Sequence, residues 1–275
     1  MSGSLATEDF EFLRRVVLDD AGLVLDPEKT YLIDRHLVPL LRRSGHASIP
    51  ALLDDLRRNP RGPLRLQVVE AMTTNETSFF RDAMVFESLR SAVIPELLRT
   101  RRASRELNLW CAACSSGQEP YSVLILLREH FPELASWRIR YVVSDLSQEM
   151  LQRTRDGIYS RLEVARGLPP ALLAKYFDAH GEQSFQVKPE LRRALDVRCI
   201  NLVADWPQLP TMDVVMIRNV MIYFEVPTKR RILQRIKSLM ARDGFLFLGT
   251  AETPRLLVDD FVRANAYGCY QLCGV

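Results

Sequence analysis

The hydrophobic pattern of this 275-residue chain changes near Met84, and that change constrains the fold more than any other feature. Beyond it, short apolar runs alternate with longer amphipathic segments, which predicts alternating strands and helices. Such an order is typical of a parallel or mostly parallel sheet with helices on both faces. The expected strands are 107–111, 138–143, 213–217, 245–249 and an antiparallel edge strand at 268–272. The expected helices are 84–101, 120–129, one that begins near Ser147, and 228–240.

The residues before this change have a different pattern. Apolar residues recur at helical spacing from residue 8 to about 72, and glycine and proline residues punctuate them. Pro39 lies inside the second of these helices and is expected to kink or split it. We predict an all-helical domain at 1–72, a linker at 73–83 and an α/β domain at 84–275. A small antiparallel β insertion is expected at about 178–200, formed by the segments 184–188 and 195–200.

Composition narrows the class of protein. Apolar residues make up 47% of the chain and charged residues 26%, which is ordinary for a globular protein. The net charge of +3 gives no reason to expect a nucleic-acid partner. No apolar run approaches the ~20 residues of a membrane span, and the polar N-terminus lacks a signal-peptide pattern. We expect a cytoplasmic protein that does not insert into a membrane and functions as a monomer.

The first chemical motif follows the strand 107–111. A turn of small residues leads into a helix start at Glu119 and Pro120. In open α/β sheets this arrangement forms a corner that binds phosphates or nucleosides, although such turns also occur without a ligand. The glycine pattern of dinucleotide-binding sites is absent. The acid Glu119 would repel a phosphate and attract a cationic amine or sulfonium.

The next strand ends in an acid. Asp145 follows the strand 138–143, at a position where an acid commonly binds the ribose hydroxyls of an adenosine-containing ligand. The alternative is that this end of the strand caps the following helix, a role equally natural for Ser144, Asp145 or Ser147. Together, Glu119 and Asp145 favour S-adenosylmethionine over a nicotinamide cofactor.

A third polar group follows the strand 213–217. Arg218 and Asn219 lie at its carboxyl end, where such sheets place their active sites, and Tyr223 is either a further site residue or a buried core tyrosine. No metal site is expected, because the histidines are scattered and the pair Cys111 and Cys114 has no second pair of ligands nearby.

The segment 73–81, with the sequence TTNETSFFR, lies between the two compositionally different halves. It joins several hydroxyl, amide and charged groups to two phenylalanines, a mixture that suits a pocket for a polar, flat ligand. Domain boundaries are common places for such pockets.

These motifs resemble those of the chemotaxis receptor methyltransferases, the CheR family. The matching motifs are TTNETSFFR, AACSSGQEPYS, SDLSQEML with a downstream DGIY, INL at 200–202, and RNVMIYF. They follow the family's order and span almost the whole chain. The resemblance implies a helical N-terminal domain joined to a Rossmann-like S-adenosylmethionine-binding domain. It also implies methyl transfer to the γ-carboxylates of glutamates on receptor helices, which yields methyl esters and S-adenosylhomocysteine.

The resemblance also implies roles for individual residues. Glu119 would face the methionine portion of the cofactor, Asp145 its ribose, and Asn201 and Leu202 its adenine. Arg81 and Tyr223 would surround the transferred methyl group and the incoming carboxylate. The full set of implied cofactor contacts is Asn75, Thr77, Arg81, Glu119, Asp145, Asn201, Leu202, Arg218 and Asn219.

Receptor recognition is expected in the helical domain, where Arg35, Arg42 and Arg43 belong to a basic cluster that suits glutamate-rich helices. The alternative for this cluster is a solvated basic face. The segment 178–189 is shorter than the glycine-rich loop with which some family members bind a receptor tail, which favours the tail-independent subgroup. Two other functions remain open from sequence: a methyltransferase for RNA or another protein, and a non-catalytic S-adenosylmethionine-binding adaptor.

Overall fold

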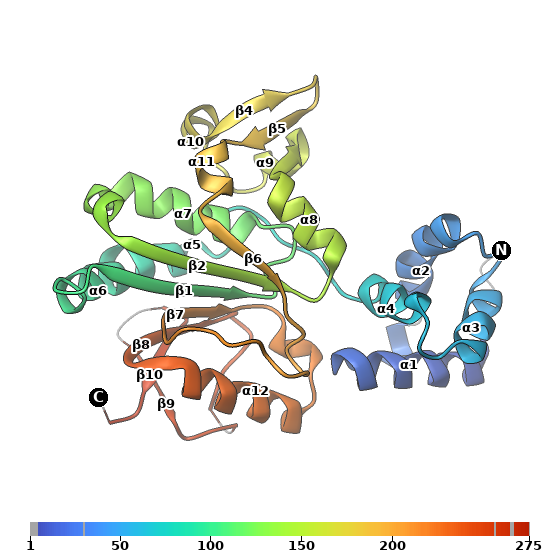
Figure 1. Ribbon diagram of the computed structural model, residues 1–275. Helices are drawn as coiled ribbons and strands as arrows, with labels where there is room; N and C mark the ends of the chain where they lie inside the picture. The colour runs from blue at the N-terminus through green and yellow to red at the C-terminus, as the bar shows by residue number, and fades with distance from the viewer. Residues whose placement is uncertain (1–4, 30, 256, 265–266, 275) are drawn as a thin grey trace. The chain divides into compact units, whose positions relative to one another are not determined.

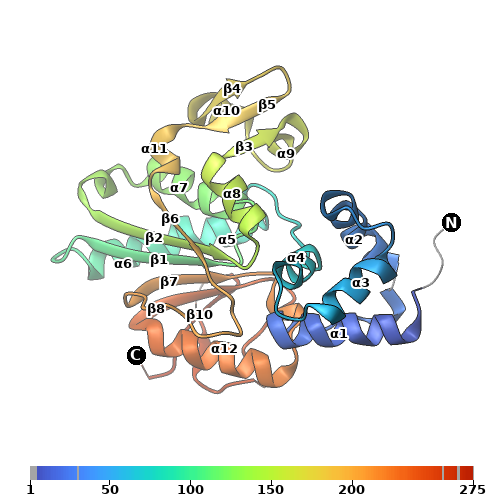
Figure 2. The same ribbon diagram turned by 45° about the vertical axis from the view of Figure 1, so that its right-hand side comes forward.

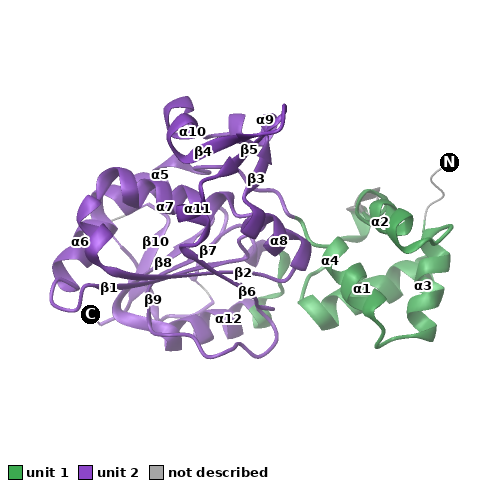
Figure 3. Cartoon of the chain, turned by 45° about the horizontal axis from the view of Figure 1, so that its top comes forward, with its two compact units in different colours: residues 1–74, 223–228 green, residues 75–222, 229–275 purple. Residues whose placement is uncertain are grey.

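The structure is a computed structural model that describes residues 5–29, 31–255, 257–264 and 267–274. The chain divides into two compact units (Figure 3). The helical unit comprises Met1–Thr74 and Tyr223–Thr228, and the α/β unit comprises Asn75–Ile222 and Lys229–Val275. In the described part of the chain, no helix combines the length and the apolar character needed to cross a bilayer.

The helical unit is built from short amphipathic helices whose apolar residues meet in one core. Leu13, Leu37 and Leu52, from three different helices, are fully buried. Arg65 and Asp20 join two helices by an ion pair of 2.6 Å. The elements are α1 (Thr7–Ala21), η1 (Pro27–Lys29), α2 (Tyr31–Ser44), α3 (Ile49–Arg58) and α4 (Pro63–Ala71).

Of the expected kink or split of the second helix at Pro39, the split is wrong, because α2 is one helix from Tyr31 to Ser44. Pro39 lacks the N–H that would bond to the carbonyl of Arg35. Both residues are exposed, so water can bond to that carbonyl and the helix continues at modest cost.

The centre of the α/β unit is a seven-stranded sheet with the order β6-β2-β1-β7-β8-β10-β9 (Figure 1). The strands from β6 to β8 are parallel, and β10 is antiparallel to both β8 and β9. The mostly parallel sheet of the sequence prediction is therefore confirmed. The predicted last strand is β10, which is antiparallel as expected. It does not form the edge of the sheet, because β9, a strand not predicted from sequence, lies outside it. The strands are β1 (Glu106–Ala112), β2 (Arg138–Asp145), β6 (Leu195–Cys199), β7 (Met212–Ile217), β8 (Met240–Leu248), β9 (Phe261–Arg263) and β10 (Cys269–Leu272).

Helices cover both faces of this sheet. In Figures 1 and 2, α5, α6 and α7 lie over one face and α12 lies over the other. The predicted helix 84–101 is continuous, but a π-helical turn, η2 (Leu89–Val93), interrupts its α-helical geometry. The helical elements are α5 (Ala83–Ser88), η2, α6 (Ile94–Thr100), α7 (Gln118–His130), η3 (Pro132–Ser136), α8 (Gln148–Asp156), η4 (Met221–Tyr223) and α12 (Val226–Leu239).

The β insertion has different boundaries from those predicted. Its sheet has the order β3-β5-β4, with β3 (Ile158–Ser160), β4 (Phe177–His180) and β5 (Ser184–Val187) all antiparallel to their neighbours. The segment 195–200 does not belong to it, because β6 pairs in parallel with β2 at the edge of the main sheet. The short helices around this insertion are α9 (Arg161–Ala165), α10 (Pro170–Tyr176) and α11 (Pro189–Arg192).

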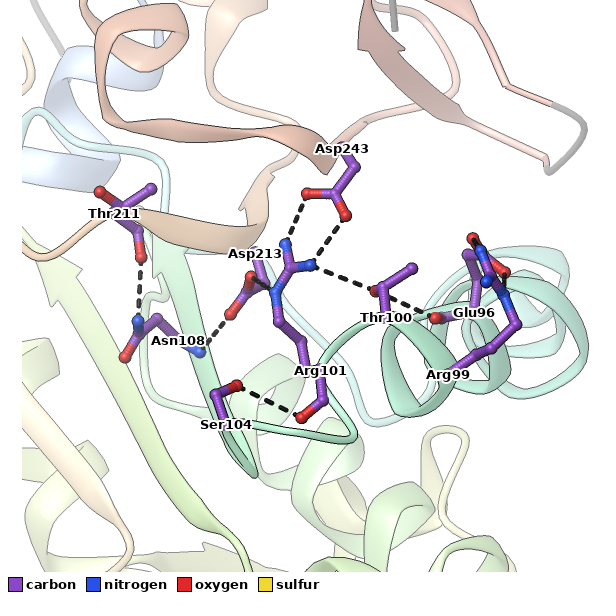
Figure 4. Close-up of polar contacts among 9 residues, drawn as sticks. All are labelled: Glu96, Arg99, Thr100, Arg101, Ser104, Asn108, Thr211, Asp213 and Asp243. Atoms are coloured by element: carbon purple, nitrogen blue, oxygen red, sulfur yellow. Dashed lines mark hydrogen bonds and ion pairs between the residues drawn. The ribbon is translucent and has the colours of Figure 1, made fainter.

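At the amino ends of the central strands, an arginine joins three elements (Figure 4). Arg101, directly after α6, donates to Asp213 on β7 at 2.8 Å and to Asp243 on β8 at 2.6 and 2.7 Å. Asp213 also accepts the backbone N–H of Asn108 on β1 at 2.8 Å. We call Arg101, Asp213 and Asp243 the amino-end network, and it ties α6 to three strands.

Candidate active site

The strand order reverses between β1 and β7, and polar groups gather at the carboxyl ends of the strands there. From β1 the chain moves to β2 on one side, whereas β7 lies on the other. The register places Ala112 beside both Ser144 and Ile217. The turn after β1, Asp145 at the end of β2, and Arg218 after β7 therefore lie at one edge of the sheet. Ligands of open α/β sheets bind at such a reversal.

Asp145 is buried and held rigidly. Its two carboxylate oxygens accept the backbone N–H groups of Ser115 at 2.8 Å and Ser147 at 2.9 Å. Burial raises the pKa of the Asp145 carboxyl above its ordinary value, against the opposing effect of these backbone donors. The N-cap of α8 is Ser147, whose hydroxyl accepts the N–H of Met150. Asp145 thus does not cap α8 and fixes the turn after β1 instead.

Glu119, Arg218 and Asp82 form an ion-pair network at this edge, which we call the carboxyl-end network. Arg218 donates to the carboxylates of Glu119 and Asp82, and it also donates to the carbonyl of Arg81 at 3.1 Å. Its side chain is only 1% exposed. Burial lowers the pKa of the Arg218 guanidinium, but the charges of Glu119 and Asp82 outweigh this effect and raise it overall. Arg218 therefore links the first turn of α7 to the segment that carries Arg81.

The segment 73–81 is anchored to the α/β unit at two points. The carbonyl of Asn75 accepts the hydroxyl of Ser115 at 2.9 Å, next to the turn after β1. Phe79 is fully buried, and its ring packs edge-on against Tyr159 at 5.0 Å. Gly167 passes so close that an added Cβ would lie 2.0 Å from the carbonyl of Phe79. Thr77, which is half-buried, lies between these two fixed points in the chain, and Arg81 follows the second of them by two residues.

Arg81 is partly exposed, and none of the described carboxylates pairs with it. One guanidinium nitrogen donates to the carbonyl of Glu76 at 3.0 Å, which closes a short loop within the segment. The guanidinium has five N–H groups, so enough of them remain for a bidentate contact with a carboxylate.

Asn219 is held in an unusual backbone conformation by Glu252. The backbone N–H of Asn219 donates to Glu252 at 2.8 Å, and the N–H of Gly249 donates to the same carboxylate oxygen at 2.6 Å. A Cβ at residue 249 would lie 2.6 Å from that oxygen and 2.8 Å from the backbone nitrogen of Asn219. Only glycine fits there, because it lets the end of β8 approach Asn219.

Asn201 and Leu202 begin the loop that leaves β6. The N–H of Ile200 donates to the carbonyl of Asp145 at 3.1 Å, so the loop starts beside the end of β2. The Asn201 side chain accepts the N–H of Val203 at 3.0 Å, and Leu202 is buried. These two residues therefore share the carboxyl edge of the sheet with Asp145.

The remaining predicted residues belong to the helical unit. Tyr223 is partly exposed, so it is not a buried core tyrosine, and its carbonyl accepts the N–H of Val24 at 2.9 Å. Arg35, Arg42 and Arg43 are exposed on α2.

Backbone strain concentrates at the carboxyl edge. Phe80, Asp82, Ala113, Ser115 and Asn219 have positive φ values although none is glycine, and Arg105 is the sixth such residue in the described part of the chain. Such conformations cost about 1–3 kcal/mol each for most residue types and persist where the surroundings enforce them. Strained residues cluster at functional sites, and here they fall in the segment 73–82, in the turn after β1 and directly after Arg218.

Three residues of this edge were missed from sequence. Asp82 pairs with Arg218, Ser115 holds both Asp145 and Asn75, and Glu252 holds Asn219. Asp82 and Ser115 lie inside or next to motifs already singled out, and Glu252 follows closely after the strand 245–249. Their positions near the motifs could have marked them as site residues, but the spacing of residues in the sequence does not identify their hydrogen-bonding partners.

The charges at this edge fit a ligand with one net positive charge. This edge holds the three carboxylates of Asp82, Glu119 and Asp145 and the two guanidiniums of Arg81 and Arg218, so its formal charges sum to one negative charge. S-adenosylmethionine carries a sulfonium and an ammonium against one carboxylate, so its charge is complementary. In addition, Nε of Arg218 is a buried donor without a protein partner, and a bound ligand or water can supply the acceptor.

The described residues show no group of three potential ligands that could hold a metal ion. Cys111 and Cys114 are both buried, and burial raises the pKa of each thiol well above its ordinary value. The Cys111 thiol donates to Glu119 at 3.3 Å, so it packs beneath the carboxyl-end network.

Comparisons with known proteins agree with this geometry. Residues 8–73 match a family model described as "CheR methyltransferase, all-alpha domain", and residues 75–266 match "CheR methyltransferase, SAM binding domain". The chemotaxis protein methyltransferase Cher2 of Pseudomonas putida is 41% identical over 92% of this chain and 93% of its own length. Chemotaxis protein methyltransferase 1 of Pseudomonas aeruginosa is 40% identical over 94% of each chain. The chemotaxis protein methyltransferase of Vibrio parahaemolyticus is 33% identical over 98% of each chain.

Proposed function

We propose that this chain, which belongs to the CheR methyltransferase family, methylates glutamate side chains of chemotaxis receptors. The methyl donor is S-adenosylmethionine, and the products are a glutamate γ-methyl ester and S-adenosylhomocysteine. The observation that carries this proposal is the carboxyl-end network beside Asp145 at the strand reversal, because its residue types, burial and net charge suit this donor.

The cofactor supplies one thing to the reaction, an electrophilic methyl group on a positively charged sulfur. The protein's task is to orient the two reactants. A glutamate carboxylate has an unperturbed pKa of about 4.3, so it is already ionised near neutral pH and needs no general base. Arg81 would hold this carboxylate through charge-assisted hydrogen bonds, and Tyr223 would donate to a remaining lone pair. Correct orientation can contribute several kcal/mol, up to about 7–11 in ideal cases.

We propose that the remaining site residues each bind a different portion of the cofactor. Glu119 would bind the methionine portion, Asp145 the ribose, and Asn201 with Leu202 the adenine. Asn75 and Thr77 would contribute from the anchored segment, while Arg218 and Asn219 would fix the network around it. The rigid hold on Asp145 supports its role, since both carboxylate oxygens already point at backbone donors and have further lone pairs for ribose hydroxyls.

The helical domain, residues 1–72, is proposed to recognise the receptor, and the linker 73–83 to contribute to the active site. Arg35, Arg42 and Arg43 form an exposed basic surface on α2, which suits glutamate-rich helices. Such a reaction would take place in the cytoplasm, with the enzyme acting as a monomer on receptor helices.

Transfer of labelled methyl groups from S-adenosylmethionine to receptor-containing membranes tests the function. Label that alkali releases marks carboxyl methyl esters, and label that resists alkali would contradict the proposal. Arg81→Ala should lose at least about tenfold in turnover, the cost of one charge-assisted contact. Arg90→Ala is the matched control, because Arg90 is an exposed arginine in the same unit. Near-normal turnover of Arg81→Ala with normal cofactor binding would show that Arg81 does not hold the carboxylate.

A further inference from the structure

The loop that leaves β6, residues 200–211, is fastened to α12 by an arginine of that helix. The guanidinium of Arg235, on α12, lies 4.0 Å above the centre of the Trp206 ring and donates to the carbonyl of Ala204 at 2.6 Å. The indole N–H of Trp206 donates to the carbonyl of Leu202 at 3.2 Å. Arg235 and Trp206 thus hold two carbonyls of the loop, one of them from a proposed cofactor contact.

The same ring is also fastened to the sheet. Trp206 packs edge-on against the fully buried Trp110 of β1, with ring centres 5.0 Å apart. The indole N–H of Trp110 donates to the hydroxyl of Ser144 at 3.0 Å, and Ser144 directly precedes Asp145. The stack of Arg235, Trp206 and Trp110 therefore runs from α12 to the strand end that carries the buried acid.

The middle of this loop is its exposed part, and Arg235 and Trp206 contact it there. Ala204, Asp205, Pro207 and Gln208 are exposed and Trp206 is only partly buried, whereas Leu202 and Leu209 are buried, so the stretch between these two leucines buries little side-chain surface. The first residue, Ile200, is bound to the carbonyl of Asp145. Without Arg235, the stretch after Leu202 loses both a charged donor and the cation over the ring, and its backbone can leave the edge of the sheet.

We propose that Arg235 and Trp206 are positioning residues that set the affinity for the adenosine half of the cofactor. They do not touch the reacting atoms, but they hold the loop of Asn201 and Leu202 beside Asp145. This inference rests on the proposed function, since it takes the cofactor to be S-adenosylmethionine. The methionine half contacts other elements in that proposal, so its binding should be insensitive to the stack.

Binding of two ligands to Arg235→Ala, measured by calorimetry, tests this assignment. S-adenosylhomocysteine contains both halves of the cofactor, and 5′-methylthioadenosine lacks the amino acid. Both should bind about tenfold more weakly, as expected for a partly desolvated cation–π contact together with a charged hydrogen bond. The KM for S-adenosylmethionine should rise by a similar factor, while kcat at saturation stays within about twofold.

Further variants separate positioning from general destabilisation. Arg231→Ala is the matched control, because Arg231 is an exposed arginine one helical turn away on α12, and its binding should match that of the unmodified chain. Arg235→Lys keeps a cation near the ring and should recover part of the affinity. Trp206→Phe keeps an aromatic ring but loses the hydrogen bond to Leu202. It should weaken the binding of both ligands by a smaller factor than Arg235→Ala does.

Two results would overturn the proposal. A lower melting temperature of Arg235→Ala with unchanged affinity for both ligands would make the stack purely structural. A loss confined to S-adenosylhomocysteine would place its effect on the methionine half. The unmodified chain tests the proposed function separately: if it bound neither ligand, the cofactor assignment itself would fail, whereas this inference concerns only the ratio between variant and unmodified chain.

Discussion

Replacing Arg218 by alanine should destabilise the α/β unit by about 3 kcal/mol. The guanidinium bridges Glu119 and Asp82, and its side chain is 1% exposed. Removing one partner of a buried ion pair costs about 3–5 kcal/mol, because the opposite charge stays buried without compensation. The side chains of Glu119 and Asp82 are 13% and 28% exposed, so water can reach them in part. The low end of the range is therefore expected.

Tryptophan fluorescence during urea unfolding measures the free energy of unfolding of the α/β unit, in which Arg218 lies. The chain has three tryptophans, Trp110, Trp137 and Trp206, and all of them belong to the α/β unit. The signal is therefore insensitive to the helical unit. Arg161→Ala is the control, since Arg161 is an exposed arginine of the same unit and such surface changes usually stay within about 0.5 kcal/mol.

The comparison of these two variants decides whether the carboxyl-end network is a coupled ion-pair system. Equal free energies of unfolding for Arg218→Ala and Arg161→Ala would refute the reasoning. Asp82→Asn removes one charge and keeps the shape, so its cost should lie between the two. In the double variant Arg218→Ala with Asp82→Asn, the cost should be smaller than the sum of the single costs, because one carboxylate no longer stays unpaired.

Two further perturbations test other parts of the α/β unit. Arg101→Met should cost about 3 kcal/mol at pH 7 by leaving Asp213 and Asp243 without their cation. Urea unfolding at several pH values measures this loss in the free energy of unfolding. Hydrogen bonding to Arg101 lowers the pKa of Asp243 from 3.8, and an acid with a lowered folded pKa loses its stabilisation as pH falls through that pKa. The difference between Arg101→Met and the unmodified chain should therefore shrink as pH falls below 3.8. Gly249→Ala should lower the melting temperature and abolish the thermal shift caused by S-adenosylhomocysteine, because the new methyl would lie 2.6 Å from Glu252 Oε2. An unchanged thermal shift would show that the position of Asn219 is not needed for binding.

Much of the α/β fold could be predicted because its strands are nearly continuous apolar runs. All six residues of β7 are buried, and the last four of β1 are buried as well. A parallel strand covered on both faces needs this composition, so period and length together identify it. Asp145 and Arg218 then follow directly, since each is a charged residue placed immediately at the end of such a run.

The misassigned strands have a different character. β6 has a mixed pattern of exposed and half-buried residues, because it lies at the edge of the main sheet, and its sequence fits an antiparallel hairpin equally well. β9 has only three residues, of which one is buried. For such strands the partner is chosen by tertiary packing rather than by local pattern. The contacts of Asp82 and Glu252 were unpredictable for the same reason, since their partners lie far away in sequence.

The two arginine networks at opposite ends of the sheet differ in how fully the arginine is hydrogen-bonded. In each, one guanidinium bridges two carboxylates. At the amino end, Nε and both terminal nitrogens of Arg101 donate to side-chain oxygens, so each of its three nitrogens has a partner. At the carboxyl end, Nε of Arg218 is buried without a partner, and the backbone around it is strained at Asp82 and Asn219. An unmade buried hydrogen bond costs about 1–3 kcal/mol, and stability alone gives no reason to keep it. A bound ligand or an ordered water that accepts from Arg218 would remove this cost, so occupancy of the carboxyl end would stabilise the fold.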